Sequence, residues 1–324
     1  MAGKLDYEKL KDKREELDIT QKNLSERTNI NLSTIKAIET GRSSCDIETL
    51  KKITHELDLN IANIYEENFH ETKVISVVNN KGGSGKTSVT GSLGYALSEM
   101  GYRLLLIDAD MQMSLSHSFN LDKNEKNLSV AILSENSLEN YIIKTEYENI
   151  DFIVSDLGMA TIEMTLFTKI QRESILKHIL KPIIDKGVYD FVIIDTNPTL
   201  AILNFNVLNA SNFCIVPVNP DSFGVENIDI VLDFIESVKK FNLELKAVKI
   251  LLNKYDIRTK KITKKCENYV RENYSDILLD TIIKIDTSLQ NAQFDNKPVL
   301  VFDTSSRISK EYRELAKEII KIVR

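Results

Sequence analysis

Cysteine is scarce in this sequence: Cys45, Cys214 and Cys266 are the only three among 324 residues. They are isolated and odd in number, which argues against a disulfide framework and favours the reducing cytosol. The four histidines share no metal-ligand spacing with these cysteines, and this argues against a structural zinc site.

Long apolar runs are also missing. None approaches the roughly 18 residues that a membrane span needs, and the N-terminal stretch MAGKLDYEKLKDKREEL is too charged for a secretory signal. The net charge of −6 excludes a protein coated in basic residues, so any contact with nucleic acid must come from a local patch. We expect a cytoplasmic protein.

The chain has two regions of different texture. Residues 4–65 carry apolar positions at helical spacing and no strand pattern, which predicts a small all-α domain over residues 1–66. From about Lys73, short β-branched runs alternate with helical stretches; the runs are VISVVN, RLLLIDAD, IDFIVS, YDFVIIDT, FCIVPV and AVKILLNK. Such a pattern is typical of a parallel sheet covered on both faces. We expect a doubly wound, mostly parallel α/β domain over residues 74–324, after a linker at 67–73.

The stretch VVNNKGGSGKTSVT has the order of a phosphate-binding loop, with a strand before it and a helix after it. Its glycines let the backbone approach a phosphate, and the helix N-terminus adds amide donors. We expect Lys86 to reach the β- and γ-phosphates and Thr87 to hold Mg²⁺. The alternative, a flexible Gly/Ser loop, is disfavoured by the flanking elements. The predicted cofactor-binding residues of the loop are Gly82, Gly83, Ser84, Gly85, Lys86, Thr87 and Ser88.

The loop departs from the ordinary pattern because Asn80 and Lys81 stand where a glycine would begin it. It resembles the deviant phosphate loop, K-G-G-x-G-K-[TS], of the ParA/MinD family of P-loop ATPases. The resemblance implies that Lys81 contacts the phosphates bound by the other subunit of an ATP-sandwich dimer. The alternative is a solvated lysine beside the pocket.

Two further strand ends resemble motifs of that family. In LLLIDADMQMSLS the resemblance places Asp108 near the Mg²⁺ and gives Asp110 the role of positioning the attacking water. In YDFVIIDTNPTL it assigns Asp195 to the Mg²⁺ site, with Asn197 in place of a common proline. Met111 replaces another proline, so we expect a looser turn and slower hydrolysis. For either aspartate alone, capping of the next helix is an alternative. The implied catalytic residues are Lys81, Lys86 and Asp110; the implied metal ligands are Thr87, Asp108 and Asp195.

The same resemblance covers roughly residues 73–324 and implies a base-binding pocket. In LLNKYDIRT it assigns Asn253 to a hydrogen bond with adenine, and in VPVNPD it places Pro217 on the other side of the base. Both assignments are weak as motifs, since many strand ends carry Asn or Pro. The implied cofactors are ATP and Mg²⁺.

A local basic patch is present in KYDIRTKKITKK. Partition proteins of the family bind DNA non-specifically through basic residues near the C-terminus, and pairs four residues apart fall along one side of a helix. Near the end of the chain, one residue aligns with a family arginine implicated in DNA binding, and a second such arginine is replaced by Ile285 beside a lysine. A solvated charged face is the alternative. The predicted contacts are Arg258, Lys260, Lys261, Lys264, Lys265, Lys284 and Arg307.

Residues DITQKNLSERTNINLSTIKAIETGR resemble the helix-turn-helix of Cro/cI-type phage repressors, although Ser25 replaces the common Ala and Asn29 the turn Gly. The resemblance implies that Gln21 bonds a DNA phosphate. It also makes Ser33, Thr34 and Lys36 candidate readers in the major groove. Residues 1–65 contain 11 Lys/Arg and 12 Asp/Glu, so one copy would bind DNA weakly and a contact with protein is the alternative.

Together these resemblances indicate a ParA-type partition ATPase with an N-terminal DNA-binding domain. Such a protein would form an ATP-dependent homodimer, bind nucleoid DNA, and hydrolyse ATP slowly until stimulated by a ParB-like centromere-binding partner. Its helix-turn-helix would bind an operator and regulate its own operon. One alternative is a nucleotide-responsive transcriptional regulator without cargo. A MinD-like positioning ATPase is disfavoured because the chain stops at AKEIIKIVR without an amphipathic extension, so no membrane contact is expected.

Overall fold

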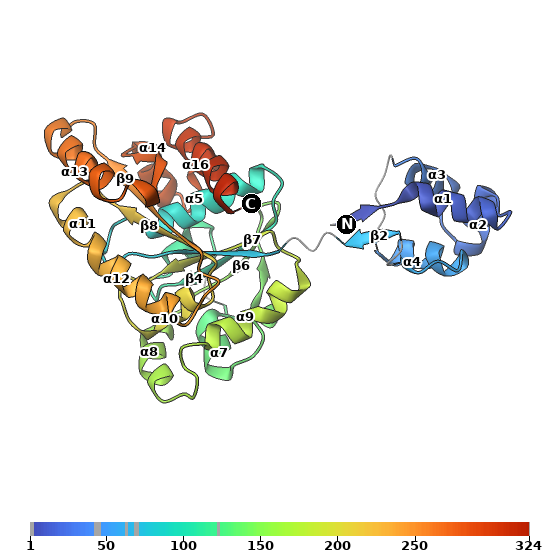
Figure 1. Ribbon diagram of the computed structural model, residues 1–324, viewed down its shortest axis with the longest axis horizontal. Coiled ribbons are helices and arrows are strands. Elements are labelled where there is room, and N and C mark those ends of the chain that lie inside the picture. The colour runs from blue at the N-terminus through green and yellow to red at the C-terminus, as the bar shows by residue number, and fades with distance from the viewer. Residues whose placement is uncertain (1–2, 42–46, 62–63, 68–70, 122–123, 324) are drawn as a thin grey trace. The chain divides into compact units, whose positions relative to one another are not determined.

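The computed structural model describes residues 3–41, 47–61, 64–67, 71–121 and 124–323. The chain forms two compact units, residues 1–70 and residues 71–324 (Figure 1). The boundary between them falls inside the stretch 67–73 that the sequence suggests as a linker.

The N-terminal unit is a cluster of four short helices closed by a two-stranded sheet. Its elements are β1 (Gly3–Leu5), α1 (Tyr7–Glu16), α2 (Gln21–Thr28), α3 (Leu32–Glu39), α4 (Ile47–Glu56) and β2 (Tyr65–Glu67). The core side chains Leu10, Leu24, Ile35, Leu50 and Ile53 are fully buried. The expectation of an all-α domain is wrong in one respect, because β1 and β2 pair in antiparallel fashion.

The turn between α2 and α3 explains the two departures from the repressor pattern. Asn29 ends α2 in the left-handed region, at φ 55°, which a short polar side chain tolerates better than a branched one. The hydroxyl of Ser25 donates a hydrogen bond to the carbonyl of Ile30 at 2.6 Å. Both substitutions therefore suit the turn of a helix-turn-helix.

A buried ion pair ties the first three helices together. Nε of Arg14 on α1 donates to Oε1 of Glu39 on α3 at 2.7 Å, and Gln21 at the start of α2 donates to Oε2 of Glu39 at 2.7 Å. Only 8% of the Arg14 side chain and 1% of the Glu39 side chain are exposed. The hydrogen bond from Glu39 raises the pKa of Arg14, so this pair stays ionised at any ordinary pH.

The second unit is built on an eight-stranded sheet with the strand order β10-β9-β8-β3-β7-β4-β6-β5. All neighbouring strands are parallel except β5, which runs antiparallel to β6. The strands are β3 (Lys73–Val77), β4 (Leu104–Ala109), β5 (Ile143–Lys144), β6 (Ile150–Ile153), β7 (Phe191–Thr196), β8 (Phe213–Val218), β9 (Ala247–Tyr255) and β10 (Leu278–Lys284). The predicted doubly wound α/β fold is confirmed.

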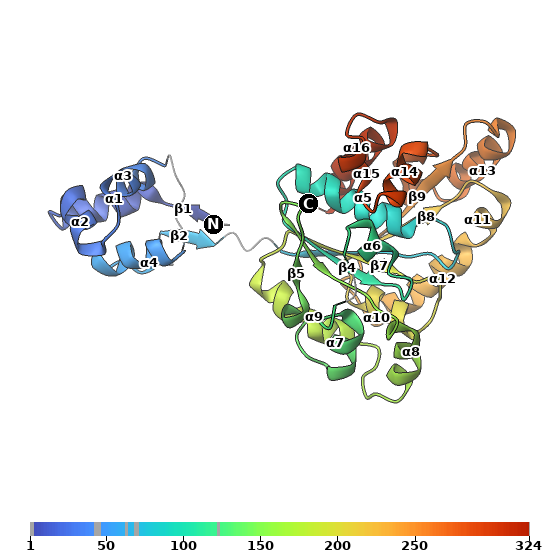
Figure 2. The same ribbon diagram turned by 180° about the vertical axis from the view of Figure 1, so that it is seen from behind.

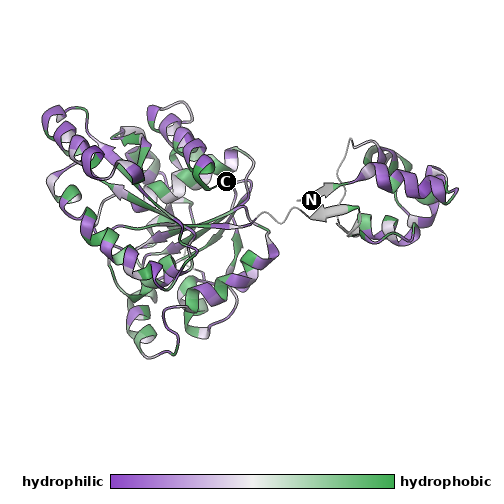
Figure 3. Cartoon of the chain, in the orientation of Figure 1, coloured by the Kyte–Doolittle hydropathy of each residue, from purple (hydrophilic) through white to green (hydrophobic). Residues whose placement is uncertain are grey.

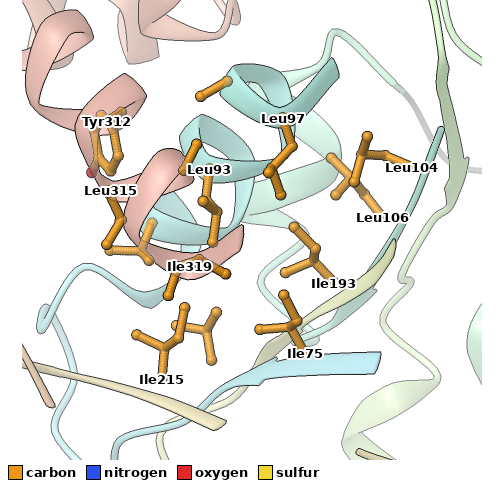
Figure 4. Close-up of a cluster of buried hydrophobic side chains, with 14 of the residues drawn as sticks. Ile75, Leu93, Leu97, Leu104, Leu106, Ile193, Ile215, Tyr312, Leu315 and Ile319 are labelled. Atoms are coloured by element: carbon orange, nitrogen blue, oxygen red, sulfur yellow. The ribbon is translucent and has the colours of Figure 1, made fainter. Parts of the chain in front are cut away.

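Helices cover both faces of this sheet (Figures 1 and 2). On one face lie α5 (Lys86–Glu99), α6 (Ser114–Ser118), α14 (Thr287–Phe294), α15 (Val299–Phe302) and α16 (Arg307–Val323). On the other lie α7 (Leu128–Ser134), α8 (Met159–Phe167), α9 (Ile175–Lys186), α10 (Ile202–Asn209), α12 (Ile228–Lys239) and α13 (Lys260–Asn273), with α11 (Ser222–Glu226) leading into α12. Figure 4 shows α5 and α16 packing their leucine and isoleucine side chains onto the central strands.

Parallel strands bring their carboxyl ends, and the loops that follow them, to one edge of the sheet. The loop after β3 therefore lies between the ends of β7 and β8, its two neighbours. Asp108 on β4 is the register partner of Asp195 on β7, so two carboxylates stand side by side at this edge. In the part of the chain that the structure describes, no helix combines the length and apolarity needed to cross a bilayer.

Candidate functional site

The loop between β3 and α5 is shaped by glycines. Gly83 and Gly85 have φ values of 73° and 91°, in the region that side chains rarely adopt. A Cβ atom on Gly85 would lie 2.2 Å from Nδ2 of Asn253, whereas at Gly82 and Gly83 nothing lies within 4 Å. The loop is thus closely packed underneath and open above, as a cradle for an anion must be.

A cavity of about 610 Å³ opens over this loop and the first turns of α5. Among the predicted residues, the cavity is lined by Gly82, Gly83, Gly85, Lys86, Thr87, Ser88 and Asp110. Its other wall comes from α6 and the α14–α15 region, including His117, Phe119, Gln293 and Pro298. Sequence reasoning missed this wall, since no local motif marks these residues and they lie up to about 200 positions from the loop.

Lys86 is a buried cation, with 6% of the residue exposed. Its Nζ lies 3.3 Å from the Lys81 carbonyl oxygen, and among the described residues it has no ion pair. Burial lowers the pKa of Lys86, while the charges of Asp195 and Asp110 oppose that shift. An anion bound in the cavity would relieve the cost of burying this charge.

Asp195 ends β7 and is fully buried. Neither carboxylate oxygen makes a hydrogen bond of normal geometry within the described chain, although the Thr87 hydroxyl lies near enough to favour the charged form. Burial and the neighbouring Asp108 raise the pKa of Asp195 well above its usual value. A buried carboxylate without partners is the kind of group that a divalent cation satisfies.

Asp108 differs from Asp195 because its oxygens are already in use. Oδ1 accepts the Asp110 amide at 3.1 Å, and Oδ2 accepts both the amide and the hydroxyl of Ser116, at 2.9 and 2.7 Å. Burial raises the pKa of Asp108 to about 6, while the hydrogen bonds from Ser116 lower it. The geometry argues against the predicted metal role for Asp108 and makes it the anchor of the following turn.

That turn is held more firmly than the sequence suggests. Asp110 lies at the cavity wall, and its Oδ1 accepts the Gln112 amide at 3.0 Å. The chain then turns through Met113, which is buried at φ 55°. The looser turn expected from Met111 is not observed, because side-chain hydrogen bonds replace the rigidity of a proline.

Lys81 is not a free solvated side chain. Its Nζ lies 2.9 Å from Oδ1 of Asp221, in the turn after β8. The Lys81 amide donates to Oδ1 of Asn79 at 2.7 Å, and Nδ2 of Asn79 donates to the Pro217 carbonyl at 2.8 Å. The start of the loop is therefore fastened to the end of β8.

The two predicted base-binding residues occupy different places. Nδ2 of Asn253 donates to the Ser84 carbonyl at 2.8 Å, and Asn253 lines a second cavity of about 270 Å³ that shares Ser88 and Gln293 with the first. Pro217 lies inside β8, buried on both sides. The structure does not bring Pro217 to either cavity, because a residue in the middle of a central strand is covered by both helical layers.

The predicted DNA contacts of the second unit divide into two groups. On α13, which Figure 3 colours as strongly hydrophilic, Lys260, Lys261 and Lys265 are exposed and have no carboxylate partner among the described residues. The other four are bound to acids or to the backbone. Lys264 pairs with Glu267, Arg258 with Asp256, Lys284 with Glu311, and Arg307 with Asp286 and the Ile285 carbonyl. A phosphate would have to displace these partners.

In the N-terminal unit, α3 presents Ser33 and Lys36 as exposed residues, with Thr34 half-buried between them. This arrangement suits a recognition helix. Gln21, by contrast, spends a side-chain amide hydrogen on Glu39, so at most one amide hydrogen is left for a phosphate.

Comparison with known proteins places these features in context. A family model described as an AAA domain matches residues 72–250, and one described as a helix-turn-helix matches residues 10–64. The sporulation initiation inhibitor protein Soj of Bacillus subtilis is 32% identical over 250 residues, which cover 76% of this chain and 98% of Soj.

Solved structures give the same picture. A putative plasmid partition protein from Borrelia burgdorferi bound to AMPPNP is 25% identical with a TM-score of 0.65, covering 78% of this chain and 99% of that one. Cobyrinic acid a,c-diamide synthase from Mycobacterium smegmatis with bound ADP and magnesium is 27% identical with a TM-score of 0.65, covering 77% and 94%.

Proposed function

The chain belongs to the ParA/MinD-type family of P-loop ATPases and carries an N-terminal helix-turn-helix domain, and from this premise we propose that it is a DNA partition ATPase. It dimerises around two ATP molecules, binds DNA non-specifically in that state, and returns to the monomer after hydrolysis. The observation that carries the proposal is the pair of cations on one glycine loop, Lys86 inside the cavity and Lys81 at its rim.

The cavity suits a nucleoside triphosphate. The open face above Gly82 and Gly83 leaves room for phosphate oxygens against the loop amides. Lys86 neutralises charge on the β- and γ-phosphates. Buried oxygens without hydrogen-bond partners gather beside the loop, at Asn80, Ser84 and Asn219, as expected of a site completed by a ligand or a second copy.

The residues fit a magnesium ion as well. Thr87 and Asp195 would hold it, since the Thr87 hydroxyl lies near the unsatisfied carboxylate. When bound, Mg²⁺ neutralises charge on the β- and γ-phosphate oxygens. Asp110, at the cavity wall, orients the water that attacks the γ-phosphorus as the bond to the bridging oxygen of ADP breaks.

Asp195→Asn tests the metal assignment. Because its folded pKa is raised, Asp195 costs the unliganded fold stability above the unfolded pKa near 3.8. The variant should therefore unfold at least about 2 °C higher than wild type at pH 8 without ligand. Mg·AMPPNP at 100 times its Kd should stabilise wild type by about 2.7 kcal/mol and the variant hardly at all.

The matched control for this thermal unfolding experiment is Asp151→Asn. Asp151 is also buried, but it is paired with Lys144 and Tyr189, each at 2.6 Å. Its replacement should lower the midpoint and leave the gain from Mg·AMPPNP intact. An Asp195→Asn protein that keeps the full gain would remove Asp195 from the metal site.

DNA binding by the ATPase domain rests on α13. Lys260, Lys261 and Lys265 form an unpaired basic surface on its first turns, and such lysines track a phosphate backbone without reading bases. The helix-turn-helix, with Ser33 and Lys36 exposed on α3, adds sequence-specific binding to an operator. Stimulation of hydrolysis by a ParB-like partner completes the proposed cycle.

The triple variant Lys260→Ala/Lys261→Ala/Lys265→Ala tests this surface. We expect the ATP-dependent binding of a random duplex to weaken, and the slope of log K against log salt to become shallower by about 2–3, at about 0.9 per lost phosphate contact. Fluorescence anisotropy at several salt concentrations measures both. Lys264→Ala is the control, since Lys264 is already paired with Glu267. Unchanged binding would favour a nucleotide-responsive regulator that uses only the helix-turn-helix.

A further inference from the structure

Lys81 has a counter-ion in its own chain, far away in the sequence. Its Nζ lies 2.9 Å from Oδ1 and 3.0 Å from Oδ2 of Asp221, and 6.0 Å from the centre of the Phe223 ring. The Lys81 side chain is 26% exposed and that of Asp221 is 46% exposed. The cation that should act on a second copy is therefore occupied within this copy.

Asp221 presents its carboxylate from a rigid turn. Its Oδ1 also accepts the Gly224 amide at 2.7 Å and so caps α11. A Cβ atom on Gly224 would lie 2.1 Å from the Asn219 carbonyl oxygen, so only glycine allows this close turn. The carboxylate is fixed in place, whereas the lysine ends a flexible four-carbon stem. If the pair separates, Lys81 is the partner that moves.

The backbone of Lys81 does not need to move with its side chain. Asn79 holds the Lys81 amide on one side and the Pro217 carbonyl on the other, which keeps the loop in contact with β8. Only side-chain torsions separate a Lys81 bound to Asp221 from one that reaches out of the site.

We propose that Asp221 is a positioning residue that holds Lys81 at rest, and that Lys81 exchanges it for the nucleotide of a second copy when the dimer forms. This inference rests on the proposed function and describes its control. A half-exposed ion pair is weak in water, so a γ-phosphate with more charge, held in a closed interface, can replace the carboxylate. ADP lacks that group, and with ADP the pair persists.

Asp221→Asn tests the inference because asparagine keeps the helix cap and removes the charge. Sedimentation velocity on the full chain, with Mg·AMPPNP, with Mg·ADP and without nucleotide, gives the dimer dissociation constant. We expect the variant to dimerise about 2- to 25-fold more tightly with Mg·AMPPNP, since each dimer releases two such pairs. Glu226→Gln, which removes an exposed charge from the same helix, should stay within about 2-fold of wild type.

The double variant Lys81→Ala/Asp221→Asn shows whether the effect passes through Lys81. It should dimerise as poorly as Lys81→Ala alone. If thermal unfolding shows that Asp221→Asn does not fold, Asp221→Ser provides a second capping side chain without charge.

The outcomes separate the two levels of the proposal. If wild type dimerises with Mg·AMPPNP and needs Lys81, but Asp221→Asn dimerises no more tightly than Glu226→Gln, the resting role of Asp221 is overturned and the partition ATPase stands. If wild type stays monomeric with Mg·AMPPNP, or Lys81→Ala dimerises equally well, the proposed function fails and the inference fails with it.

Discussion

Lys81→Ala should abolish the binding of random duplex DNA that appears with ATP, weakening it by at least about 100-fold at physiological salt. The physical reason is indirect, since Lys81 does not lie on the basic surface of α13. Without a second cation at the nucleotide, the two copies do not join, and a single basic helix carries too few phosphate contacts. Fluorescence anisotropy with ATP, ADP and no nucleotide measures the effect.

Lys240→Ala is the control for that experiment. Lys240 is an exposed lysine of the same domain, at the end of α12, so its replacement changes the net charge equally without touching the loop. It should shift the affinity by no more than a few-fold. ATP-dependent binding that survives in Lys81→Ala would sink the dimer mechanism, and binding confined to an operator would leave a regulator.

Glu39→Gln should unfold the N-terminal unit or bring it close to unfolding. Arg14 would keep its buried charge but lose a partner that now forms bonds of 2.7 and 2.9 Å. Removing one member of a buried pair typically costs about 3–5 kcal/mol, and a unit of this size has little more than that to lose. Scanning calorimetry of the full chain should show the transition of this unit moved far down or absent, with the ATPase transition unchanged.

Glu26→Gln serves as the comparison for that stability measurement. Glu26 lies on α2, is exposed, and reaches only Lys22 at 4.0 Å, so its loss should cost no more than about 0.5 kcal/mol. A Glu39→Gln protein that unfolds as wild type does would mean that apolar packing of Leu10, Ile35 and Leu50 holds the three helices without the ion pair.

The strands that could be predicted from the sequence are those buried on both faces. β4 and β7 are buried at every position, and a run of apolar residues is a local signal that needs no knowledge of neighbours. β10 lies at the sheet edge and is interrupted by polar residues such as Asp280, which hides it. β1 and β2 are three residues each and pair across more than 50 positions, so neither has a signal of its own.

The site divides in the same way. The glycine loop is a continuous stretch, and its preference for phosphate follows from the residues themselves. The difference between Asp108 and Asp195 depends on which one meets Ser116, and the partner of Lys81 comes from a turn 140 positions later. Such relations arise only when the strands take their order in the sheet, and that order cannot be read from spacing in one sequence.

The place of β3 in the sheet has a consequence for synthesis of the chain. β3 is the first strand of its sheet to leave the ribosome, yet it pairs with β7 and β8. The loop after it also rests on Asn253. At about 5–20 residues per second, translation from the end of β2 to that residue takes roughly 10–40 s. During this interval the helix-turn-helix is complete and able to fold, while the nucleotide loop still lacks its neighbours. A nascent chain can therefore acquire its DNA-reading half well before it can respond to ATP.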